Sequence, residues 1–513
     1  MNVIRLFLPC LICAATSWSS LVAADGKNSA RDNPGNPPIE LGRDRRQLLV
    51  DRHLIADMRG AALTLHHPQP REIAIKQEHP WEEGAISYMT TFKDGGKFRA
   101  WYRAEPRGYF QAAAEDAGMK AGKKGTASFT AYAESEDGIH WIKPKLGIVE
   151  FEGSTENNLV WVGAPGSAPN LAPFRDDNPE AKKDERYKAI VRRKNTLEAL
   201  VSPDGLRWRL ARKEPILIDP PFDTLTVAFW DPENREYVIY TRGRTTTGDL
   251  GRGMTGTFGG PGGTRSVRRA TSKNFLDWSK LEPIELGGAP REEFYTNSAI
   301  RYDRAPDYML MLPTRFASGR MPLPGIPAAY ANSAGVTDIV LLSSRDGVNW
   351  DREHMEAFIR PGLDQQNWID RAFYMERGIL QTSSTELSFY VKEHWWVTPV
   401  HIRRYTLRVD GFSSVQAPYE GGEFTTKLLV FDGGRLEINY STSAAGSLRV
   451  EIQDRNGKPI EGYRLEDCPE IFGDRIDQIV GWKSGADLGR LAGHAVRFRF
   501  VLHDADIFSF CLK

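Results

Sequence analysis

Five short segments of the chain combine carboxylates with aromatic, amide or guanidinium side chains. Cleavage of a glycosidic bond needs such groups, because one carboxylic acid protonates the leaving oxygen and one carboxylate acts as nucleophile or as the base for water. Aromatic faces stack on sugar rings, and amide or guanidinium groups bind hydroxyls and carboxylates. The segments are Trp81–Glu83, Asn170–Asp177, Phe222–Asp223, Glu292–Asn297 and Asn367–Arg371. They predict a carbohydrate site if the fold brings them together.

The candidate residues fall into two roles. The catalytic candidates are the carboxylates Asp223, Glu293, Glu82 and Glu83. The candidates for binding substrate are Trp81, Asn170, Tyr295, Asn297, Trp368, Asp370 and Arg371. Asp223 precedes an apolar run, Leu225 to Trp230, where a charge without a functional reason is unexpected. Two alternatives stay open: each glutamate is a solvated loop residue, or Asp370 and Arg371 form an ion pair that ties neighbouring elements.

A sequence repeat indicates how these segments are positioned. Ser344–Trp350 reads Ser-Arg-Asp-Gly-Val-Asn-Trp, and closely similar copies occur at Ser135–Trp141 and Ser202–Trp208. A weaker copy is Ser272–Trp278, and a degenerate one is Arg408–Val415. The copies end at residues 141, 208, 278, 350 and 415, so the interval is nearly constant. Self-similarity of this kind marks a repeat architecture.

Each repeat unit is predicted to be a four-stranded antiparallel sheet. Asp-Gly indicates a tight turn, because Gly accepts a positive φ and Asp bonds to nearby amides, and the Trp begins the returning strand. Strand-forming runs precede the first turn at Ile86–Phe92, Phe98–Tyr102 and Thr130–Glu134. Sheets with two exposed faces bury them by stacking around an axis, so five units predict a five-bladed β-propeller. Asp137, Asp204 and Asp346 are then structural turn residues.

The propeller accounts for the spacing of the candidate residues. Its blades are expected at about residues 80–146, 170–217, 222–286, 293–361 and 368–415. The innermost strand of each blade lines the central channel of a propeller, and ligands bind at one mouth of that channel. The five segments stand at the start of each blade's first strand, so they are expected to meet at the mouth.

Composition changes divide the 513 residues into four parts. Residues 1–24 combine Arg5, a short apolar run and a small-residue cleavage site, which is typical of a secretory signal. Residues 25–45 are a polar leader, and residues 46–417 are assigned to the propeller, with 47–51 as the strand that closes the ring. Residues 418–513 alternate as strands with turns at Asp432–Gly434 and Asn456–Gly457, which predicts an antiparallel β-sandwich. The mature protein is expected to be secreted or periplasmic.

Charge and hydropathy exclude two classes of partner. Lys plus Arg and Asp plus Glu both number 67, so no basic excess indicates nucleic acid. No apolar run after the signal is long enough to cross a bilayer, so no membrane partner is expected. A carbohydrate substrate is the predicted partner.

Other motifs indicate neither a cofactor nor a metal. Gly251–Gly256 matches a dinucleotide fingerprint, but a phosphate cradle must follow a strand and open a helix, so we interpret this Gly-rich stretch as a loop. His66 and His67 have no partner at metal-binding spacing. A structural cation in the channel is the one alternative left open. Cys468 and Cys511 form one disulfide or remain two buried thiols.

The propeller region, residues 80–415, resembles the five-bladed glycosidases of families 43, 32, 68 and 130 and the secreted proteins labelled family-32-like. Glu82–Ala85, Lys97–Ala104 and Ala133–Gly138 are similar in order to the first blade of those families. The resemblance implies catalytic carboxylates from the starts of inner strands in separate blades, here Glu82 or Glu83, Asp223 and Glu293. The family 32 signature motif is absent.

We therefore predict a secreted glycoside hydrolase that acts on oligo- or polysaccharides, with two alternatives. The repeat also resembles the Asp-box of sialidases, which implies a sialidase-like exo-glycosidase that holds a carboxylated sugar with Arg301 and Arg371. The other alternative is a non-catalytic propeller that binds glycans or proteins. An enzyme requires two carboxyl groups about 5 to 10 Å apart across a pocket.

Overall fold

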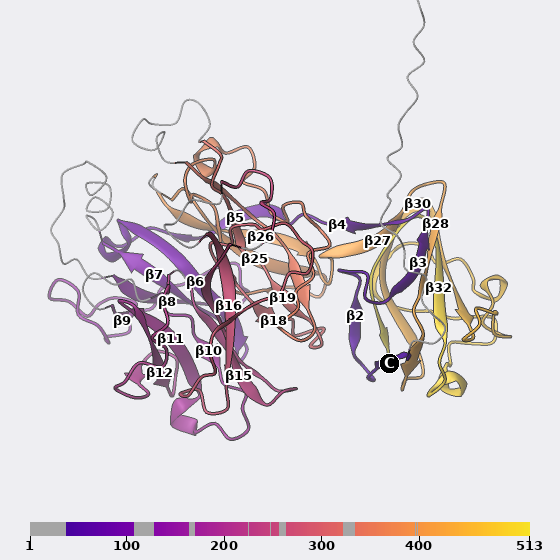
Figure 1. Ribbon diagram of the computed structural model, residues 1–513, viewed down its shortest axis with the longest axis horizontal. Helices are drawn as coiled ribbons and strands as arrows, with labels where there is room; N and C mark the ends of the chain where they lie inside the picture. The colour runs from indigo at the N-terminus through magenta and orange to yellow at the C-terminus, as the bar shows by residue number, and fades with distance from the viewer. Residues whose placement is uncertain are drawn as a thin grey trace, which may run out of the picture.

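The computed structural model describes residues 37–106, 128–163, 170–321 and 334–513, apart from residues 224, 247, 256–262, 396 and 398. Its regular structure is almost entirely β, in two bodies that lie side by side (Figure 1). The signal segment 1–24, most of the leader and the insertion 108–125 lie outside the described residues. No described helix is long and apolar enough to cross a membrane. The short 3-10 turns are η1 (Pro80–Glu82), η2 (Lys183–Glu185), η3 (Gln365–Asn367), η4 (Leu465–Asp467) and η5 (Gly489–Leu491).

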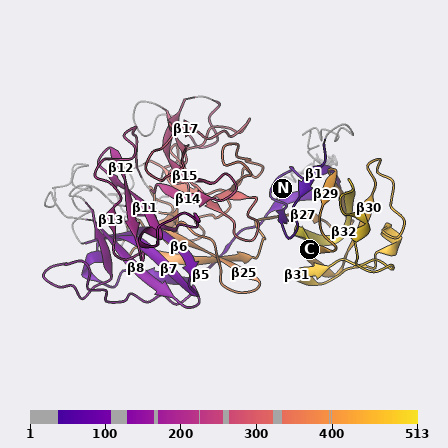
Figure 2. The same cartoon turned by 90° about the horizontal axis from the view of Figure 1, so that it is seen from below.

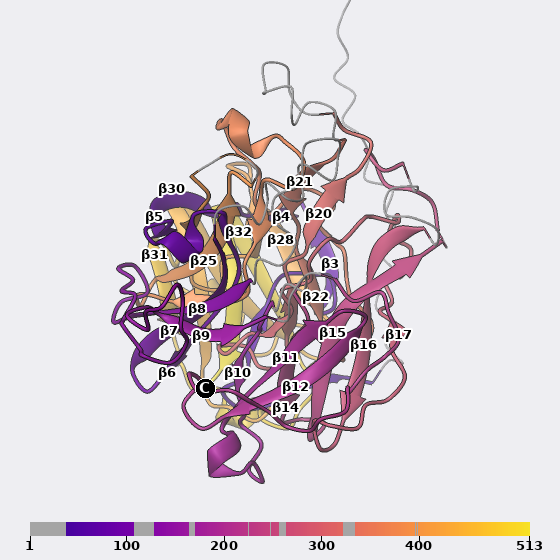
Figure 3. The same ribbon diagram turned by 90° about the vertical axis from the view of Figure 1, so that its left-hand side faces the viewer.

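Five antiparallel sheets form a five-bladed propeller, as predicted. Figure 3 looks onto the ring, with the C-terminal domain behind it. Blade one consists of β6 (Ala85–Asp94), β7 (Lys97–Glu105), β8 (Phe129–Ser135) and β9 (Leu159–Val162). Blade two consists of β10 (Phe174–Arg175), β11 (Tyr187–Arg193), β12 (Thr196–Ser202) and β13 (Arg209–Leu210). Blade one extends beyond its predicted end at residue 146, because its outer strand is β9.

Blades three and four follow the same plan with one difference. Blade three consists of β14 (Val227–Asp231), β15 (Glu236–Thr245), β16 (Thr264–Ser272) and β17 (Glu282–Pro283). Blade four consists of β18 (Ile300–Arg301), β19 (Met309–Met311) and β22 (Leu342–Ser344), and the hairpin of β20 (Thr314–Ala317) and β21 (Val336–Ile339) extends it. The described part of the Gly-rich insertion, residues 248–255, forms turns and a bridge between Leu250 and Arg291 rather than a helix.

Blade five closes the ring with a strand from near the N-terminus. Its sheet contains β23 (Tyr374–Met375), β24 (Leu380–Gln381), β25 (Glu386–Glu393), β26 (His401–Arg408) and the outermost β5 (Gln69–Lys76). The prediction that residues 47–51 close the ring is therefore wrong. The physical reason is polarity: β5 carries charged residues that suit an exposed outer strand, whereas Leu48, Leu49 and Val50 are buried.

The repeated turns join the third strand of a blade to its fourth, and their aspartates organise the backbone. In the first copy, Asp137 Oδ1 accepts hydrogen bonds of 2.8 Å from the amides of Ile139 and His140. The Gly138 amide donates to Ser135 Oγ at 2.9 Å. The copies at Asp204 and Asp346 make the same bonds. This geometry supports the structural assignment of the turn aspartates.

Each Asp-Gly turn also receives a side chain from another blade. The carbonyl of Gly205 accepts from Trp101 Nε1 at 2.7 Å, and that of Gly347 accepts from Tyr240 Oη at 2.8 Å. Tyr390 Oη donates to the carbonyl of Gly138 in the same way. The repeat therefore fixes the contacts between neighbouring blades as well as the fold of each blade.

The second body is an antiparallel β domain with its own core. Its strands are β1 (Ile39–Leu41), β2 (Arg46–Leu48), β3 (Ile55–Arg59), β4 (Ala62–Leu65), β27 (Ser413–Ala417), β28 (Gly422–Thr426), β29 (Leu429–Phe431), β30 (Leu436–Gln453), β31 (Asp474–Ile479) and β32 (Arg497–Leu512). The long strands β30 and β32 pair along their length and shift register at Thr442 and Ser447. Their inner faces enclose a core that includes Phe424, Ile438 and Phe500.

Both ends of the chain build this second domain. Strand β1 pairs with β29 (Figure 2), β2 pairs with β32, and β3 pairs with β28. The predicted boundaries, with residues 46–417 in the propeller and 418–513 in the second domain, thus differ from the structure. The N-terminal strands supply apolar residues such as Leu41 and Leu54 to the second core, which the C-terminal segment alone does not complete.

The two cysteines of the second domain are not bonded to each other. Cys468 and Cys511 are free and buried. Burial raises the pKa of both thiols, so both remain protonated and unreactive at neutral pH. The alternative of two buried thiols therefore holds.

Candidate active site

Segments at or just before the inner strands of three blades bring three tyrosines together. Tyr295 precedes β18, Tyr374 lies on β23 and Tyr88 lies on β6. The ring centroids of Tyr295 and Tyr374 are 5.2 Å apart, and those of Tyr374 and Tyr88 are 6.1 Å apart. All three side chains are buried. They form an aromatic base around which the charged groups are arranged.

Two arginines from blade three lie against the Tyr295 ring. The Cζ atoms of Arg242 and Arg265 are 4.8 Å and 5.0 Å from its centroid, a distance at which the ring face attracts a cation. Arg242 Nη2 also donates to the Tyr295 carbonyl at 2.6 Å. The second and third strands of blade three, β15 and β16, thus position the guanidinium groups.

Each of these arginines binds one of the predicted catalytic carboxylates. Asp223 lies 3.4 Å from the Nη1 atoms of both Arg242 and Arg192, and its side chain is 46% exposed. Glu293 accepts from Arg265 Nη1 at 2.6 Å and is fully buried. Glu293 Oε1 has no hydrogen-bond partner among the described residues. The structure therefore links Asp223 and Glu293, from different blades, to one tyrosine ring.

Positive charge exceeds negative charge around this pair. Arg244, on β15, lies in the field of both carboxylates as well as of Arg242 and Arg265. Burial and the two neighbouring guanidinium groups lower the pKa of Arg244. Its Nη1 atom is buried without a hydrogen-bond partner among the described residues. A buried unpaired donor is unfavourable unless a ligand satisfies it.

A second layer of charged residues supports Tyr88 and Tyr374. Lys392 Nζ lies 3.7 Å from the Tyr374 ring centroid and 3.9 Å from that of Trp395. Arg103 lies over Tyr88, with Cζ 4.7 Å from the centroid, and its Nε is 3.0 Å from Glu105 Oε1. Strands β7 and β25 contribute these groups from blades one and five.

Burial changes the protonation of this layer. It raises the pKa of Glu105 to about 7 and that of Glu376 to about 8. It also holds the pKa of Lys392 well below its usual value. Glu376 accepts from the amides of Tyr88 and Met89, so it joins blade five to blade one. Glu105 pairs with Arg103 and lies in the field of Lys392, and a pKa of about 7 allows its carboxyl to exchange a proton near neutral pH.

Three of the other six predicted binding residues, Asn170, Asp370 and Arg371, lie near the tyrosine cluster. Asn170 Oδ1 accepts from Arg103 Nη1 at 3.1 Å. Asp370 and Arg371 form an ion pair of 2.6 Å with each other, as the alternative expected. Burial would lower the pKa of Arg371, but the neighbouring Tyr295, Asp370 and Tyr374 raise it. Arg371 therefore lies beside the aromatic base.

Glu82 is held in a separate cluster of blade one. Tyr102 Oη donates to Glu82 Oε1 at 2.6 Å, and Lys143 Nζ donates to Oε2 at 2.9 Å. Tyr102 and Arg103 are successive residues of β7, so they point to opposite faces of the sheet. Glu82 is fully buried on the Tyr102 face, apart from the Tyr295 cluster. Glu83, the next residue, is exposed.

Three further candidates make structural bonds. Trp81 Nε1 donates to Asn158 Oδ1 at 2.9 Å, within the same cluster as Glu82. Asn297 Nδ2 donates to the carbonyls of Leu225 and Tyr240 at 3.3 Å, which ties two strands of blade three to blade four. Trp368 lines a different cavity of 960 Å³ at the edge of blade four. The bonds of Trp81 and Asn297 and the cavity lined by Trp368 do not include Tyr295 or its arginines.

The two arginines that the sialidase-like alternative requires lie at different places in the structure. Arg301 binds Asp231, at the far end of β14, and the carbonyl of Pro306. It lines the cavities at the opposite ends of the inner strands. Arg371 lies beside Tyr295 instead, so the two guanidinium groups do not share a site.

Sequence reasoning missed residues of second and third strands and two residues beyond strand ends. The strand residues are Arg103, Glu105, Arg242, Arg244, Arg265 and Lys392, and the other two are Glu376 and Trp395. The sequence singles out only the start of each first strand, because first strands line the channel. One signal was present: Arg103, Glu105 and Lys392 interrupt apolar strand sequence, the same feature that singled out Asp223.

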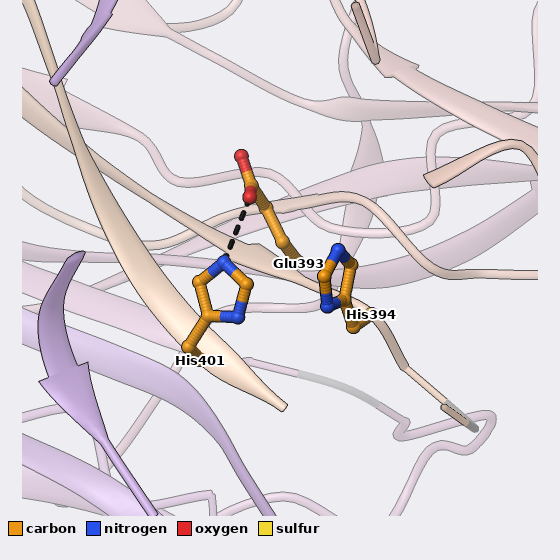
Figure 4. A group of neighbouring side chains, drawn as sticks. All are labelled: Glu393, His394 and His401. Atoms are coloured by element: carbon orange, nitrogen blue, oxygen red, sulfur yellow. Dashed lines mark hydrogen bonds and ion pairs between the residues drawn. The ribbon is translucent and has the colours of Figure 1, made fainter. Parts of the chain in front are cut away.

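One group of described residues has the geometry to hold a metal ion, although the histidine spacing predicted none. Glu393, His394 and His401 place one ligand atom each within 4.8 Å of one another (Figure 4). The two histidines are separated by the β25–β26 connection, so the sequence spacing resembles no common motif. The pairing of Glu393 with His401 across the strands brings the ligands together.

Comparisons with known proteins give structural matches alone. No family model and no curated protein matches the chain. A glycoside hydrolase is 13% identical with a TM-score of 0.44, over 67% of this chain and 92% of its own. A β-1,2-mannobiose phosphorylase from Listeria innocua is 11% identical with a TM-score of 0.42, over 68% and 98%. A family 43 arabinoxylan arabinofuranohydrolase from Bacillus subtilis is 9% identical with a TM-score of 0.39, over 85% and 96%. These values transfer no activity to this chain, whose propeller is defined by its own sheets.

Proposed function

We propose that this protein is a glycoside hydrolase whose active site surrounds Tyr295 at the channel mouth. The observation that carries the proposal is that Asp223 and Glu293, from separate blades, both reach the Tyr295 ring through arginines. Buried tyrosines beside carboxylates suit a sugar ring and its acid-base cleavage. Export is part of the proposal and is supported by the sequence of residues 1–24.

The carboxylates have different environments and hence different proposed roles. Asp223 is exposed and acts as the nucleophile or as the base for water. Glu105, whose pKa burial raises to about 7, acts as the general acid on the leaving oxygen. Glu293, buried beside Arg265, supplies negative charge near the oxocarbenium-like transition state. Tyr88 lies in the field of Asp223 and under Arg103, which connects the acid to the rest of the site.

The proposed substrate is a glycan that carries an anionic group. Four arginines, Arg192, Arg242, Arg244 and Arg265, face two carboxylates in the cluster. A carboxylate or sulfate on the sugar balances this charge and supplies the missing partner of Arg244 Nη1. A hydroxyl of a neutral glycan accepts from that donor but does not balance the positive charge.

The test is a screen of the purified protein against chromogenic and polymeric glycans, with and without uronic acid residues. We expect turnover that is greatest on acidic glycans and falls about 10²- to 10⁴-fold in Asp223→Asn. Glu293→Gln is expected to lose activity as well, while Asp204→Asn, in an outer turn, retains it. Turnover that survives both site substitutions contradicts the assignment.

A non-catalytic glycan-binding propeller is the competing function. It uses the same tyrosines and arginines but needs no group that exchanges a proton near neutral pH. Saturable glycan binding with no hydrolysis, equally strong in wild type and in Glu105→Gln, supports the binding function instead. The partly exposed Asp223 and the raised pKa of Glu105 favour the enzyme.

A further inference from the structure

We propose that Glu393, His394 and His401 bind a divalent transition metal ion of the zinc type. The group lies where β25 passes into β26, and Figure 4 shows the three side chains converging. Glu393 Oε2 is 2.9 Å from His401 Nε2. The two imidazole rings are 4.5 Å apart at an interplanar angle of 84°. This inference is independent of the proposed function.

The backbone of His394 is bent in a way that brings its ring to the group. Glu393 and His394 are successive residues, and in an extended strand their side chains point to opposite faces. His394 instead has a φ of 65°, in the left-handed region that residues other than glycine rarely adopt. Strained backbone of this kind clusters at functional sites and ligand clamps.

The protonation of His394 leaves one nitrogen available to a metal. Asp364 Oδ2 lies 2.7 Å from His394 Nε2, and a carboxylate accepts, so Nε2 carries the proton. Nδ1 then presents a lone pair. This atom is buried and has no hydrogen-bond partner among the described residues. A histidine that donates one N–H to a carboxylate while its other nitrogen is free is the arrangement of metal-ligating histidines.

The donor set selects the class of metal. Two imidazoles and one carboxylate suit zinc and its neighbours in the first transition series, whereas calcium and magnesium require oxygen ligands. The side chains are only 3%, 12% and 6% exposed for Glu393, His394 and His401. Three protein ligands leave one tetrahedral position for water.

Neighbouring groups set the affinity of the site. Tyr405 Oη donates to Glu393 Oε1 at 2.7 Å and orients the carboxylate. Arg403 Nε lies 3.0 Å from Glu393 Oε2, so its positive charge competes with a metal ion. Its Nη2 lies 3.4 Å from His401 Nε2, and Nη1 donates to the carbonyl of Arg71 at 2.8 Å. Removal of the Arg403 charge should therefore strengthen metal binding.

The site would fix the connection that carries Trp395. This residue follows His394 directly, and its ring lies 3.9 Å from Lys392 Nζ in the layer below Tyr374. A metal that holds His394 to His401 joins the end of β25 to the start of β26. The expected role is to hold the β25–β26 connection, and hence Trp395, in one position.

The test is calorimetric titration of untagged, chelator-treated protein with Zn²⁺, together with visible absorption of the Co²⁺ form. We expect one Zn²⁺ per chain and the intense visible bands of tetrahedral Co²⁺. Asp364→Asn should weaken binding about 10- to 100-fold, and Arg403→Gln should strengthen it. His140→Ala is the matched control, because His140 is an exposed histidine outside the group.

Two variants decide the result. His394→Ala and His401→Ala should each abolish the Co²⁺ bands while circular dichroism shows the native fold. Zinc binding that is equal in wild type and in both variants is adventitious and overturns the proposal. Absence of binding in wild type and in Arg403→Gln overturns it as well.

Discussion

At the scale of single residues, Glu105 gives the proposed mechanism a pH dependence. Burial raises the pKa of this carboxyl to about 7, and a general acid works only when protonated. We therefore expect kcat to fall as the pH rises through about 7, because Glu105 then loses its proton. The measurement is a profile of kcat against pH for the best substrate from the glycan screen.

Glu105→Gln separates this role from a structural one. The amide donates no proton, so kcat should fall about 10²- to 10⁴-fold, and the alkaline limb of the profile should disappear. A substrate with a more acidic leaving group should recover much of the rate, since it needs no protonation. Glu180→Gln, at an exposed glutamate outside the site, is the control. A retained alkaline limb in Glu105→Gln contradicts the assignment.

Glu82 provides the opposite prediction. Its carboxylate is fully buried with Lys143, so Glu82→Gln leaves the Lys143 ammonium with Glu78 alone, at 3.2 Å. We expect the free energy of unfolding to fall by about 3 kcal/mol, while kcat per folded molecule stays unchanged. Urea unfolding measures the first quantity. Lost kcat at unchanged stability would restore a catalytic role for Glu82.

The contrast between Glu82 and Glu105 shows what the sequence could reveal of the site. Asp223, Glu293 and Tyr295 were predictable, because the repeat places them at equivalent starts of inner strands. Glu82 stands at the same kind of start, yet a 3-10 turn rotates it into the blade. Glu105 ends β7 and pairs with Ala85 across the sheet, a register that no local pattern encodes. The sequence thus points to candidates that stand at the start of a strand. It does not point to residues that reach the site only through the pairing of one strand with the next.

At the scale of elements, the repeated turn explains both its glycine and its exceptions. Gly138, Gly205 and Gly347 have φ values of 73°, 76° and 72°. The weaker third copy has Phe275 at this position with a φ of 68°. Phe275 packs against Phe174 and Tyr237, and its carbonyl accepts from Trp278 Nε1 of the same turn at 3.0 Å. Glycine is therefore required where a neighbouring blade docks on the turn.

Gly347→Ala tests this explanation. A Cβ atom at residue 347 would lie 2.5 Å from Tyr240 Oη and 2.9 Å from Met309 Sδ, in addition to the strain of a positive φ. We expect a loss of stability of about 2 to 4 kcal/mol. Gly287→Ala is the matched control, since its φ is 57° but nothing lies within 4 Å of the added atom. It should cost only about 1 kcal/mol, and equal losses in both variants would contradict the docking argument.

The same repeat made five blades predictable and left the ring closure unpredictable. A motif at a near-constant interval specifies how many sheets form and where their turns lie. The closing strand β5 carries no copy of the motif and pairs with β26, more than 300 residues away. The buried run Leu48–Val50 has the stronger strand sequence but packs between the two domains. Hydropathy favoured the wrong segment, because an outer strand is the most polar of a blade.

At the scale of the whole molecule, the degenerate fifth repeat has become a junction between the domains. Asp410 occupies the position of the turn aspartates but accepts from Tyr302 Oη at 2.7 Å and from Arg304 Nε at 3.0 Å. Arg46, on β2, approaches it at 3.4 Å, and Ser509, on β32, donates at 3.2 Å. One buried carboxylate therefore joins blade four to an N-terminal strand and a C-terminal strand of the second domain.

Asp410→Ala should uncouple the two domains. The substitution leaves Arg46 buried with Glu437 and the Ser509 hydroxyl and removes the carboxylate that pairs with Arg304, a loss of about 3 to 5 kcal/mol. We expect one calorimetric transition for the wild type and two for the variant, because each domain keeps its own core.

Burial alone would raise the pKa of Asp410, but Arg304 and Arg46 hold it below its usual value. The carboxylate therefore stabilises the folded protein above the ordinary pKa of an aspartate, and this contribution is lost as the pH falls through the lower folded value. Wild type at acid pH should consequently approach the two transitions of the variant, and a single transition in both would show that the apolar contact alone couples the domains.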